Sequence, residues 1–255
     1  MKIVAVAAVN NEGVLHENLM ASPLIKKEII SLKVMLNQRT AGTAYNAGIC
    51  QTEEDIIVFA HQDVYLPAGW LQKLKVGIRL VENEDPDWAV IGVIGMQYDG
   101  NLAGRVWSSG LNREIGNSPT RPVGVVSIDE MLIVLRRSSG IRFDEELPGF
   151  HLYGTDIVQT ALASGLGAYV IDAPAVHNST RIHSLDNMYF QCYWYLRRKW
   201  FKRLPIATTV LPITRFAYPL WRYKLRSLLN GNVFRKRETI RPLSAIGVAK
   251  RLKYE

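Results

Sequence analysis

The sequence has few cysteines, and none of its apolar runs has the length of a membrane span. Only two of its 255 residues are cysteines, Cys50 and Cys192, and their separation fits no metal-binding motif. We therefore expect two reduced, buried thiols in a cytosolic protein. The first apolar run, residues 2–9, is followed by polar residues without a small-residue cleavage site. It therefore indicates a first strand rather than a signal peptide.

Acidic residues are scarce in the last part of the chain. Residues 184–255 contain 16 Lys and Arg but only 3 Asp and Glu, whereas the first 183 residues contain 15 Lys and Arg and 20 Asp and Glu. The last part also holds 13 of the 24 aromatic residues. A change of composition of this size indicates a boundary. We predict a first domain of residues 1–183 and a helical, aromatic and basic C-terminal extension of residues 184–255.

Long apolar runs are also missing from this extension. Its longest uncharged run, residues 204–214, has 11 residues and includes two prolines, whereas a membrane span needs about 20 apolar residues. Residues 184–203 and 214–229 have the pattern of amphipathic, aromatic-basic helices. These helices would either cover one flank of a sheet or lie on an anionic membrane surface. Nucleic acid is an unlikely partner, because no nucleic-acid motif accompanies the basic residues.

Short apolar runs alternate with helix-like segments through the first 183 residues. Strands are predicted at residues 2–9, 27–36, 55–60, 88–95, 125–137 and 168–173, the second being ambiguous and the fifth being one strand or two. Helices are predicted at residues 40–53, 67–83 and 155–165, with Pro67 in a first turn and Gly165 at a C-cap. This alternation predicts an α/β fold with a mostly parallel, Rossmann-like sheet and helices on both faces. Ligands of such sheets bind at the carboxyl ends of the strands.

One predicted strand runs directly into three polar residues. Residues 55–60 are followed by His61, Gln62 and Asp63. Residues two apart in an extended segment point to the same side, so His61 and Asp63 face one ligand together. An imidazole with a carboxylate suits a divalent metal ion that also holds phosphate oxygens. The alternative is structural: a strand end with a solvated aspartate and a capping histidine.

Two further polar residues occupy comparable positions. Asp156 opens the helix predicted at residues 155–165, where free N–H groups and the helix dipole favour a carboxylate. Taken alone, it would be a simple helix cap. His177 follows the last predicted strand, where a single histidine is more often structural than a ligand. The functional interpretation gains weight because three such groups fall at strand ends or in the loops that follow them.

In combination and in order, several segments resemble those of a known family. They are TAYNAGI (43–49), DIIVFAHQDVYLPAGW (55–70), GFHLYGTDIVQTALASGLGAYVI (149–171) and VHNS (176–179). They are similar to segments of the family-2-type nucleotide-sugar glycosyltransferases with an A-type fold, which is a single Rossmann-like domain. The greatest similarity is to the branch in which His-Gln-Asp replaces the usual Asp-x-Asp. The resemblance covers residues 1–180.

The resemblance implies a donor site. Asp63 and His61 would hold Mn²⁺ or Mg²⁺ bridging the diphosphate of a nucleotide sugar, and His177 would complete the metal site. Asn10 would lie near the base, and Asn46 near the nucleotide or the sugar.

The resemblance also implies an acceptor side. Asp156 would be the catalytic base, and Asp129 and Glu130 would line the acceptor or sugar pocket. The acidic pair often found before this helix is replaced here by Gly154-Thr155-Asp156, which leaves one carboxylate. A single base is enough for direct displacement with inversion.

These roles imply a glycosyltransferase that moves a sugar from a nucleotide-diphosphate donor to a hydroxyl of a saccharide or lipid-linked acceptor, in surface polysaccharide or glycoconjugate synthesis. We expect it in the cytoplasm, or peripherally at the inner face of the membrane. One alternative is a catalytically silent nucleotide-sugar-binding module in polysaccharide assembly. Another is a sugar nucleotidyltransferase, which ordinarily has a Gly-rich phosphate loop where this chain offers only Gly13.

Overall fold

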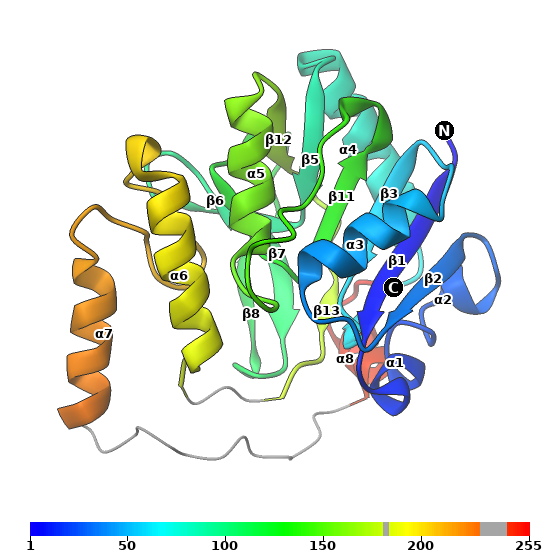
Figure 1. Ribbon diagram of the computed structural model, residues 1–255. Helices are drawn as coiled ribbons and strands as arrows, with labels where there is room; N and C mark the ends of the chain where they lie inside the picture. The colour runs from blue at the N-terminus through cyan, green and yellow to red at the C-terminus, as the bar shows by residue number, and fades with distance from the viewer. Residues whose placement is uncertain (181–183, 230–243) are drawn as a thin grey trace.

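The main sheet of the protein is mixed. The computed structural model describes residues 1–180, 184–229 and 244–255, and within them the main sheet has seven strands in the order β2-β1-β3-β11-β5-β12-β9 (Figure 1). The strands are β1 (Ile3–Val9), β2 (Ser31–Leu36), β3 (Ile56–Ala60), β5 (Trp88–Gly92), β9 (Val123–Gly124), β11 (Leu132–Arg136) and β12 (Gly167–Val170). β11 and β9 run against the other strands. The expected parallel pairing is therefore present, but an antiparallel strand interrupts it between β3 and β5.

A second sheet, which the sequence did not predict, adjoins the first. Its strands are β10 (Ser127–Ile128), β6 (Ile94–Met96), β7 (Leu102–Ser108), β13 (Val176–His177) and β4 (Val64–Tyr65) in that order, with β8 (Arg113–Asn117) paired to β7. Two predicted strands contribute to both sheets. Residues 88–95 divide into β5 and β6, and residues 125–137 divide into β10 and β11. The chain therefore passes from one sheet to the other at these two breaks.

Helices cover both faces of the main sheet, as predicted. Within the described residues they are α1 (Glu12–Glu17), α2 (Pro23–Lys26), α3 (Ala41–Cys50), α4 (Trp70–Glu84), α5 (Tyr153–Ala163), α6 (Asn187–Lys199), α7 (Tyr218–Leu229) and α8 (Ala245–Arg251). Alternate residues of β1 belong to different cores: Val4 and Val6 pack on the side of α3 and α5, and Ala5 and Ala7 on the side of α4. Figure 1 shows α3 and α5 in front of the sheet and α4 behind it.

Two local predictions need correction. α4 begins at Trp70 rather than in the region of Pro67, because Gly69, with a φ of 80°, sets the entry to the helix. Cys50 is exposed at the end of α3, so only Cys192 is the buried thiol that we expected. Gly165, by contrast, follows the C-cap of α5 with a φ of 75°, as expected for a glycine at a helix end.

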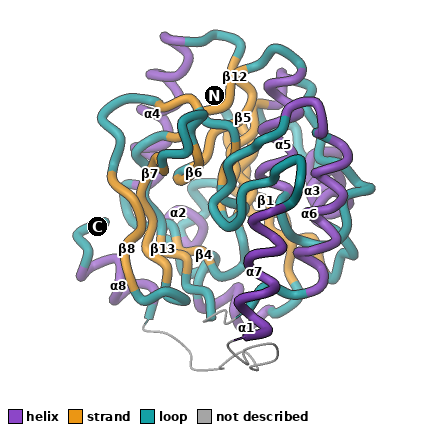
Figure 2. The backbone as a smooth tube through the Cα atoms, turned by 90° about the vertical axis from the view of Figure 1, so that its left-hand side faces the viewer, coloured by secondary structure: helices purple, strands orange, loops and turns teal. Residues whose placement is uncertain are grey.

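The residues after 183 pack on the sheet in two places. α6 buries Tyr189, Cys192, Tyr193 and Leu196 in the core that contains α3 and α5, and α7 lies outside α6 (Figures 1 and 2). α8 packs instead against the second sheet, on the side of β13. Among the described residues, no helix is both long and apolar enough to span a membrane.

A buried ion pair fastens the end of α6 to α5. The Lys199 ammonium lies 2.9 Å from Asp156 and 2.6 Å from Asp144. The Trp200 indole N–H donates to the other oxygen of Asp156 at 2.7 Å. The Asp156 side chain is only 3% exposed, so its carboxylate depends on these donors for its solvation.

Replacing Lys199 by alanine is expected to lower the free energy of unfolding by about 3 kcal/mol or more, because the buried Asp156 carboxylate loses its charged partner. Urea unfolding measures the loss. Lys73→Ala is the control: its ion pair with Asp172 is 3.1 Å long and 43% and 35% exposed, so about 1 kcal/mol or less is expected. Equal losses for the two variants would contradict this view of how α6 is held.

Candidate metal centre

Three possible metal ligands meet where the two sheets adjoin. His61 follows β3, Asp63 precedes β4, and His177 ends β13, which pairs antiparallel with β4. This pairing places Val64 opposite His177, and the Asn178 N–H donates to the carbonyl of Asp63 at 2.8 Å. One ligand atom from each of the three side chains lies within 4.8 Å of the others. The structure therefore brings together the residues that the sequence proposed as ligands.

Asp63 lies between two imidazole rings. Its Oδ1 is 3.3 Å from Nε2 of His177 and 4.0 Å from Nδ1 of His61. Burial would raise the pKa of Asp63, but His177, by its charge and its hydrogen bond, outweighs burial with a smaller contribution from His61 and holds this pKa at about 2. Burial would likewise lower the pKa of His177, but the Asp63 carboxylate outweighs it and raises this pKa.

The Tyr153 hydroxyl can select the tautomer of His61. It lies 2.6 Å from Nε2 of His61, 3.1 Å from the backbone carbonyl of Glu130 and 3.3 Å from the Tyr45 hydroxyl. When the hydroxyl donates to that carbonyl, it accepts from Nε2–H of His61, and Nδ1 of that ring keeps its lone pair. Burial lowers the pKa of His61, which keeps the ring neutral. Nδ1 faces Asp63, so the neutral ring presents a ligand atom to the cluster.

The three side chains fit a divalent transition-metal ion. They are 28%, 22% and 22% exposed for His61, Asp63 and His177, so an ion that carries further ligands can reach them from solvent. Metal–ligand distances of about 2.0–2.2 Å require only a small movement of atoms already within 4.8 Å. Two imidazole nitrogens favour an ion such as Mn²⁺ over Mg²⁺, which prefers oxygen ligands throughout.

Gln62 ties together the ends of β1 and β3. Its Oε1 accepts from the backbone N–H groups of Asn10 and Asn11 at 3.1 and 3.0 Å, and its Nε2 donates to Oδ1 of Asn10 at 2.7 Å. Asn10 therefore lies at the end of the sheet where His61 and Asp63 lie. Its expected position near the base of a nucleotide stays a prediction.

The loop between β10 and β11 places two carboxyl groups near the cluster. Asp129 accepts from the N–H of Met131 at 3.1 Å and from the Thr209 hydroxyl at 3.3 Å. The charges of Asp129 and Glu130 both act to raise the pKa of His177. Burial, with the charge of Asp129, raises the pKa of Glu130 to about 8. Glu130 is therefore a carboxyl group that can exchange a proton near neutral pH.

The first turn of α5 lies against this loop because residue 154 is glycine. A Cβ at Gly154 would lie 2.5 Å from the carbonyl oxygen of Ile128 and 3.3 Å from the nitrogen of Glu130. A larger side chain would push the helix away, and Tyr153 with it.

The structure does not bring the other two predicted residues into contact with the cluster. Asp156 uses both carboxylate oxygens on Lys199 and Trp200. Asn46 exchanges two 3.0 Å hydrogen bonds with the backbone of Phe143, and its Nδ2 also donates to Glu145 at 2.9 Å. Both side chains thus have structural partners, and the catalytic and binding roles expected for them stay predictions.

Tyr153 and Gln62 are the site residues that sequence reasoning missed. Tyr153 is only 2% exposed, and a buried aromatic residue at the start of a helix has the pattern of a core residue. Gln62 lies in a turn that the hydrogen bond from the Val64 N–H to the carbonyl of His61 closes at 3.1 Å, and not in the extended segment that the sequence predicted. The only available signal for Gln62 was its place between His61 and Asp63.

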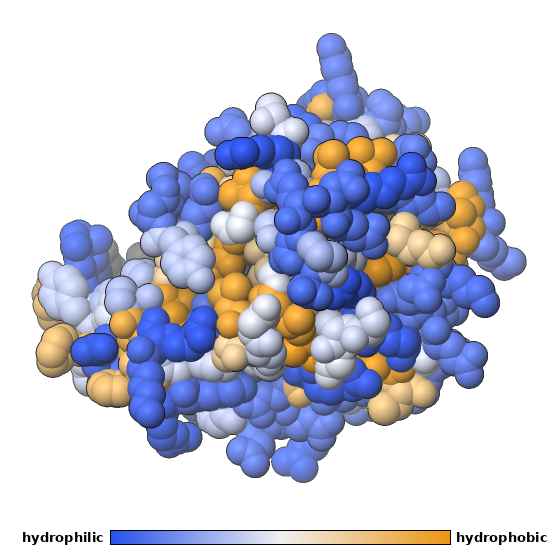
Figure 3. All heavy atoms as spheres, turned by 90° about the horizontal axis from the view of Figure 1, so that it is seen from above, coloured by the Kyte–Doolittle hydropathy of each residue, from blue (hydrophilic) through white to orange (hydrophobic). Residues whose placement is uncertain are grey.

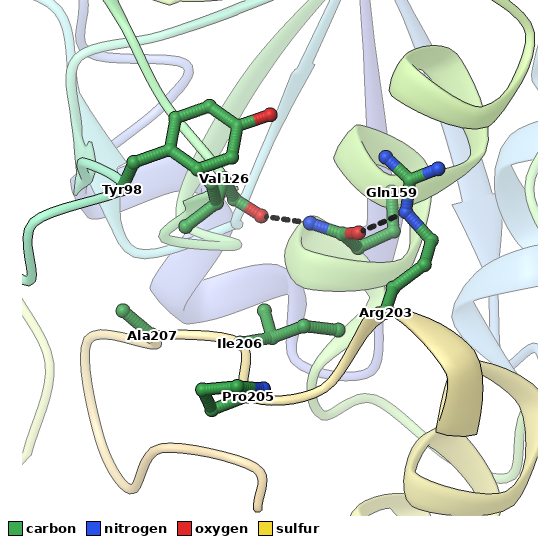
Figure 4. A pocket seen from close by; sticks show the side chains of 7 residues that line it. All are labelled: Tyr98, Val126, Gln159, Arg203, Pro205, Ile206 and Ala207. Atoms are coloured by element: carbon green, nitrogen blue, oxygen red, sulfur yellow. Dashed lines mark hydrogen bonds between the residues drawn. The ribbon is translucent and has the colours of Figure 1, made fainter.

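A cavity of about 240 Å³ lies apart from the cluster. Its lining residues are Tyr98, Val126, Gln159, Arg203, Pro205, Ile206 and Ala207 (Figure 4). Gln159 donates to the carbonyl of Val126 at 2.7 Å and accepts from Arg203 at 3.0 Å, as the dashed lines show. None of these lining residues belongs to the His–Asp cluster, so we do not count the cavity as part of the candidate site.

Tyr153→Phe is expected to lower the affinity for Mn²⁺ by about ten-fold or more, because His61 loses the acceptor that fixes its tautomer. Isothermal titration calorimetry measures the affinity. Tyr193→Phe is the matched control, since Tyr193 is also buried but donates to the carbonyl of Pro212 at 3.1 Å. An unchanged affinity in the Tyr153 variant, or no Mn²⁺ binding by the unmodified protein, would contradict the proposed ligand set.

Comparison of the sequence with known proteins identifies no family and no activity. No family model matches the chain. A curated protein called "ATP synthase subunits region ORF 6" from Fuscovulum blasticum is 32% identical over 158 residues, which cover 57% of this chain and 60% of that protein. The chain thus spans less than two thirds of this relative, whose name describes no activity.

Comparison by structure shows the fold. A structure of GalNAc-T7 with UDP, GalNAc and Mn²⁺ matches with a TM-score of 0.51 and 11% identity, over 80% of this chain and 52% of that one. S. aureus TarS 1-349 in complex with UDP-GlcNAc matches with a TM-score of 0.49 and 16% identity, over 90% and 73% of the chains. Mannosyltransferase PcManGT from Pyrobaculum calidifontis, in complex with GDP-Man and Mn²⁺, matches with a TM-score of 0.47 and 13% identity, over 80% of this chain and 64% of that one. The chain has a mixed α/β fold that resembles the A-type fold of glycosyltransferases.

Proposed function

We propose that the protein is a metal-assisted glycosyltransferase that moves a sugar from a nucleotide-diphosphate donor to an acceptor hydroxyl with inversion. The observation that carries the proposal is the cluster of His61, Asp63 and His177 at the end of β3. It lies at the edge where a sheet of this type binds its ligands. The GalNAc-T7 structure, which shares the fold, contains UDP and Mn²⁺.

The donor side follows from the ligand geometry. His61 through Nδ1, Asp63 and His177 would hold the ion, which when bound would neutralise the charge of the departing nucleoside diphosphate. Gln62 fixes the ends of β1 and β3 relative to each other, so Asn10 is held at the same edge to contact the base. Asn46 would act nearer the nucleotide or sugar, through the segment at Phe143 that it braces.

Two carboxyl groups compete for the role of base. The family resemblance assigned it to Asp156, whose oxygens accept from Lys199 and Trp200. Glu130 lies nearer the ligands, and its raised pKa of about 8 suits proton transfer from an acceptor hydroxyl. We therefore favour Glu130 as the base, with Asp129 lining the same acceptor pocket and Asp156 holding α6 in place.

A second candidate function is a catalytically silent module that binds a nucleotide sugar in polysaccharide assembly. The first turn of α5 favours the silent module, because Asp156 is the single carboxylate there. That carboxylate is buried in an ion pair with Lys199. A nucleotidyltransferase has less support, since the loop after β1 contains only Gly13. In the favoured function, the acceptor is a saccharide or lipid-linked saccharide of a surface polysaccharide or glycoconjugate, reached from the cytoplasmic side of the membrane.

Isosteric variants of Glu130 and Asp156 distinguish which of the two carboxyl groups is the base. Glu130→Gln is expected to lower turnover by about 10²–10⁴-fold, because the amide cannot take the proton of the acceptor. Asp156→Asn is expected to lower the melting temperature but to leave turnover of the folded protein within about ten-fold. Transfer from labelled nucleotide sugars measures both effects. The reverse pattern would return the role to Asp156, and no transfer by the unmodified protein from any donor that binds would favour the silent module.

Donor binding is tested by thermal shift with nucleoside diphosphates and nucleotide sugars, with and without Mn²⁺. A ligand at 100 times its dissociation constant stabilises the protein by about 2.7 kcal/mol, which corresponds to about 5 °C or more for a chain of this size. We expect that shift for one nucleotide class, only with Mn²⁺, and its loss in Asp63→Asn. A shift that is independent of Mn²⁺, or that persists in Asp63→Asn, would contradict the metal-assisted donor site.

A further inference from the structure

One face of α7 exposes large apolar side chains in a regular row. Tyr218, Trp221, Leu225, Leu228 and Leu229 are 64%, 56%, 58%, 65% and 75% exposed. They recur every three or four residues, so they lie along one side of the helix. We call these five residues the α7 face. A row of this kind is unusual on the surface of a protein that meets only water.

The opposite side of α7 is the side that packs on the protein. Leu220 is fully buried, and the Tyr223 hydroxyl accepts from the backbone N–H of Leu185 at 2.8 Å. The Lys224 ammonium lies 4.6 Å from the ring centre of Phe190 in α6. α7 thus has a fixed inner side, and it presents the α7 face outward, with the half-exposed Trp221 ring also contacting Trp194 of α6 at a centroid distance of 6.2 Å. Figures 1 and 2 show the helix beside α6, at the edge of the molecule farthest from β2.

Aromatic rings extend the exposed surface beyond the helix. Phe216 is 87% exposed and Phe201 47% exposed. The guanidinium groups of Arg197 and Arg215 each lie 5.8 Å from the ring centre of Phe201. At this end of the molecule, on the left in Figure 3, apolar and strongly hydrophilic residues lie side by side.

The charge around the α7 face is predominantly positive, although Asp186 adjoins Leu185 on the inner side of the helix. Residues 187–229 contain nine Lys and Arg and no Asp or Glu. Arg222 and Arg226 are exposed on α7 itself, next to the apolar row. A second copy of the same surface would therefore bring like charges together, which opposes self-association. Charge complementarity instead favours a partner that is anionic and also accepts apolar side chains.

We propose that the α7 face, with Phe216 and the adjacent Arg and Lys residues, docks on the surface of an anionic lipid bilayer. Tyr and Trp prefer the interface between headgroups and acyl chains, and an amphipathic helix with basic flanks lies in that plane with its apolar row inserted. The helix lies on the bilayer and does not cross it, consistent with its 12 residues. This proposal does not depend on the chemistry proposed above.

The test is co-sedimentation of the full chain with vesicles of equimolar phosphatidylcholine and phosphatidylglycerol, compared with vesicles of phosphatidylcholine alone. We expect pelleting with the anionic vesicles only, and its loss at high salt, because the Debye length falls from about 10 Å at 0.1 M to 3 Å at 1 M. Arg222→Ala and Arg226→Ala are each expected to weaken the partition coefficient about five-fold.

The apolar contribution is measured with a matched pair of double variants. Leu225→Ser/Leu228→Ser is expected to weaken binding by about ten-fold or more. Val76→Ser/Leu80→Ser, which changes two residues of α4 that are 44% and 43% exposed, is expected to have no effect. Circular dichroism checks that both variants fold.

Three outcomes would overturn the proposal. One is equal pelleting by the two double variants, and another is equal pelleting with neutral and anionic vesicles. The third is a dimer that Leu225→Ser/Leu228→Ser converts to a monomer without a change in pelleting, because the α7 face would then bind a second copy. Co-sedimentation with vesicles does not depend on donor binding. A thermal-shift screen that finds no donor would therefore contradict the proposed function but not the lipid proposal.

Discussion

The candidate site depends on one hydrogen bond, from Nε2–H of His61 to the hydroxyl of Tyr153. The hydroxyl accepts this hydrogen bond when it donates its own O–H to the backbone carbonyl of Glu130. The consequence is a neutral imidazole whose Nδ1 lone pair faces Asp63. Without that constraint, a histidine beside a carboxylate would be free to turn Nδ1–H toward it as a simple charge partner, and the cluster would be an ion pair network without an evident ligand set.

The first turn of α5 serves two parts of the molecule. Tyr153 reaches into the site, and Asp156, three residues later, holds the end of α6 through Lys199. Gly154 permits both, because only a glycine fits against the β10–β11 loop at that point. The position of the C-terminal segment and the tautomer of a proposed metal ligand are therefore linked through a single helical turn. The same segment carries α7, so the arrangement that orients the site also presents the surface that we propose for lipid.

The sequence predicted the ends of strands better than the contacts between them. The apolar run before His61 located one edge of the sheet, and His177 was found because it follows a strand. The second sheet was missed because several of its strands have two or three residues, too few for a periodic pattern. The partner of Asp156 lies 43 residues away, and no local pattern predicts such a pair, so a helix cap was the natural interpretation. The role of Tyr153 depends on a histidine 92 residues away and could not be predicted from its own surroundings in sequence.

The central claim is that His61, Asp63 and His177 hold one metal ion that in turn holds the diphosphate of a donor. Pulsed electron paramagnetic resonance of the protein with Mn²⁺ tests it most directly, because the spectrum reports the nuclei bound to the ion. We predict coupling to imidazole nitrogen in the Mn²⁺ complex, its reduction in His177→Ala, and additional coupling to phosphorus when a nucleoside diphosphate is added. A spectrum of bound Mn²⁺ without nitrogen coupling, or without phosphorus coupling at saturating nucleoside diphosphate, would contradict the account.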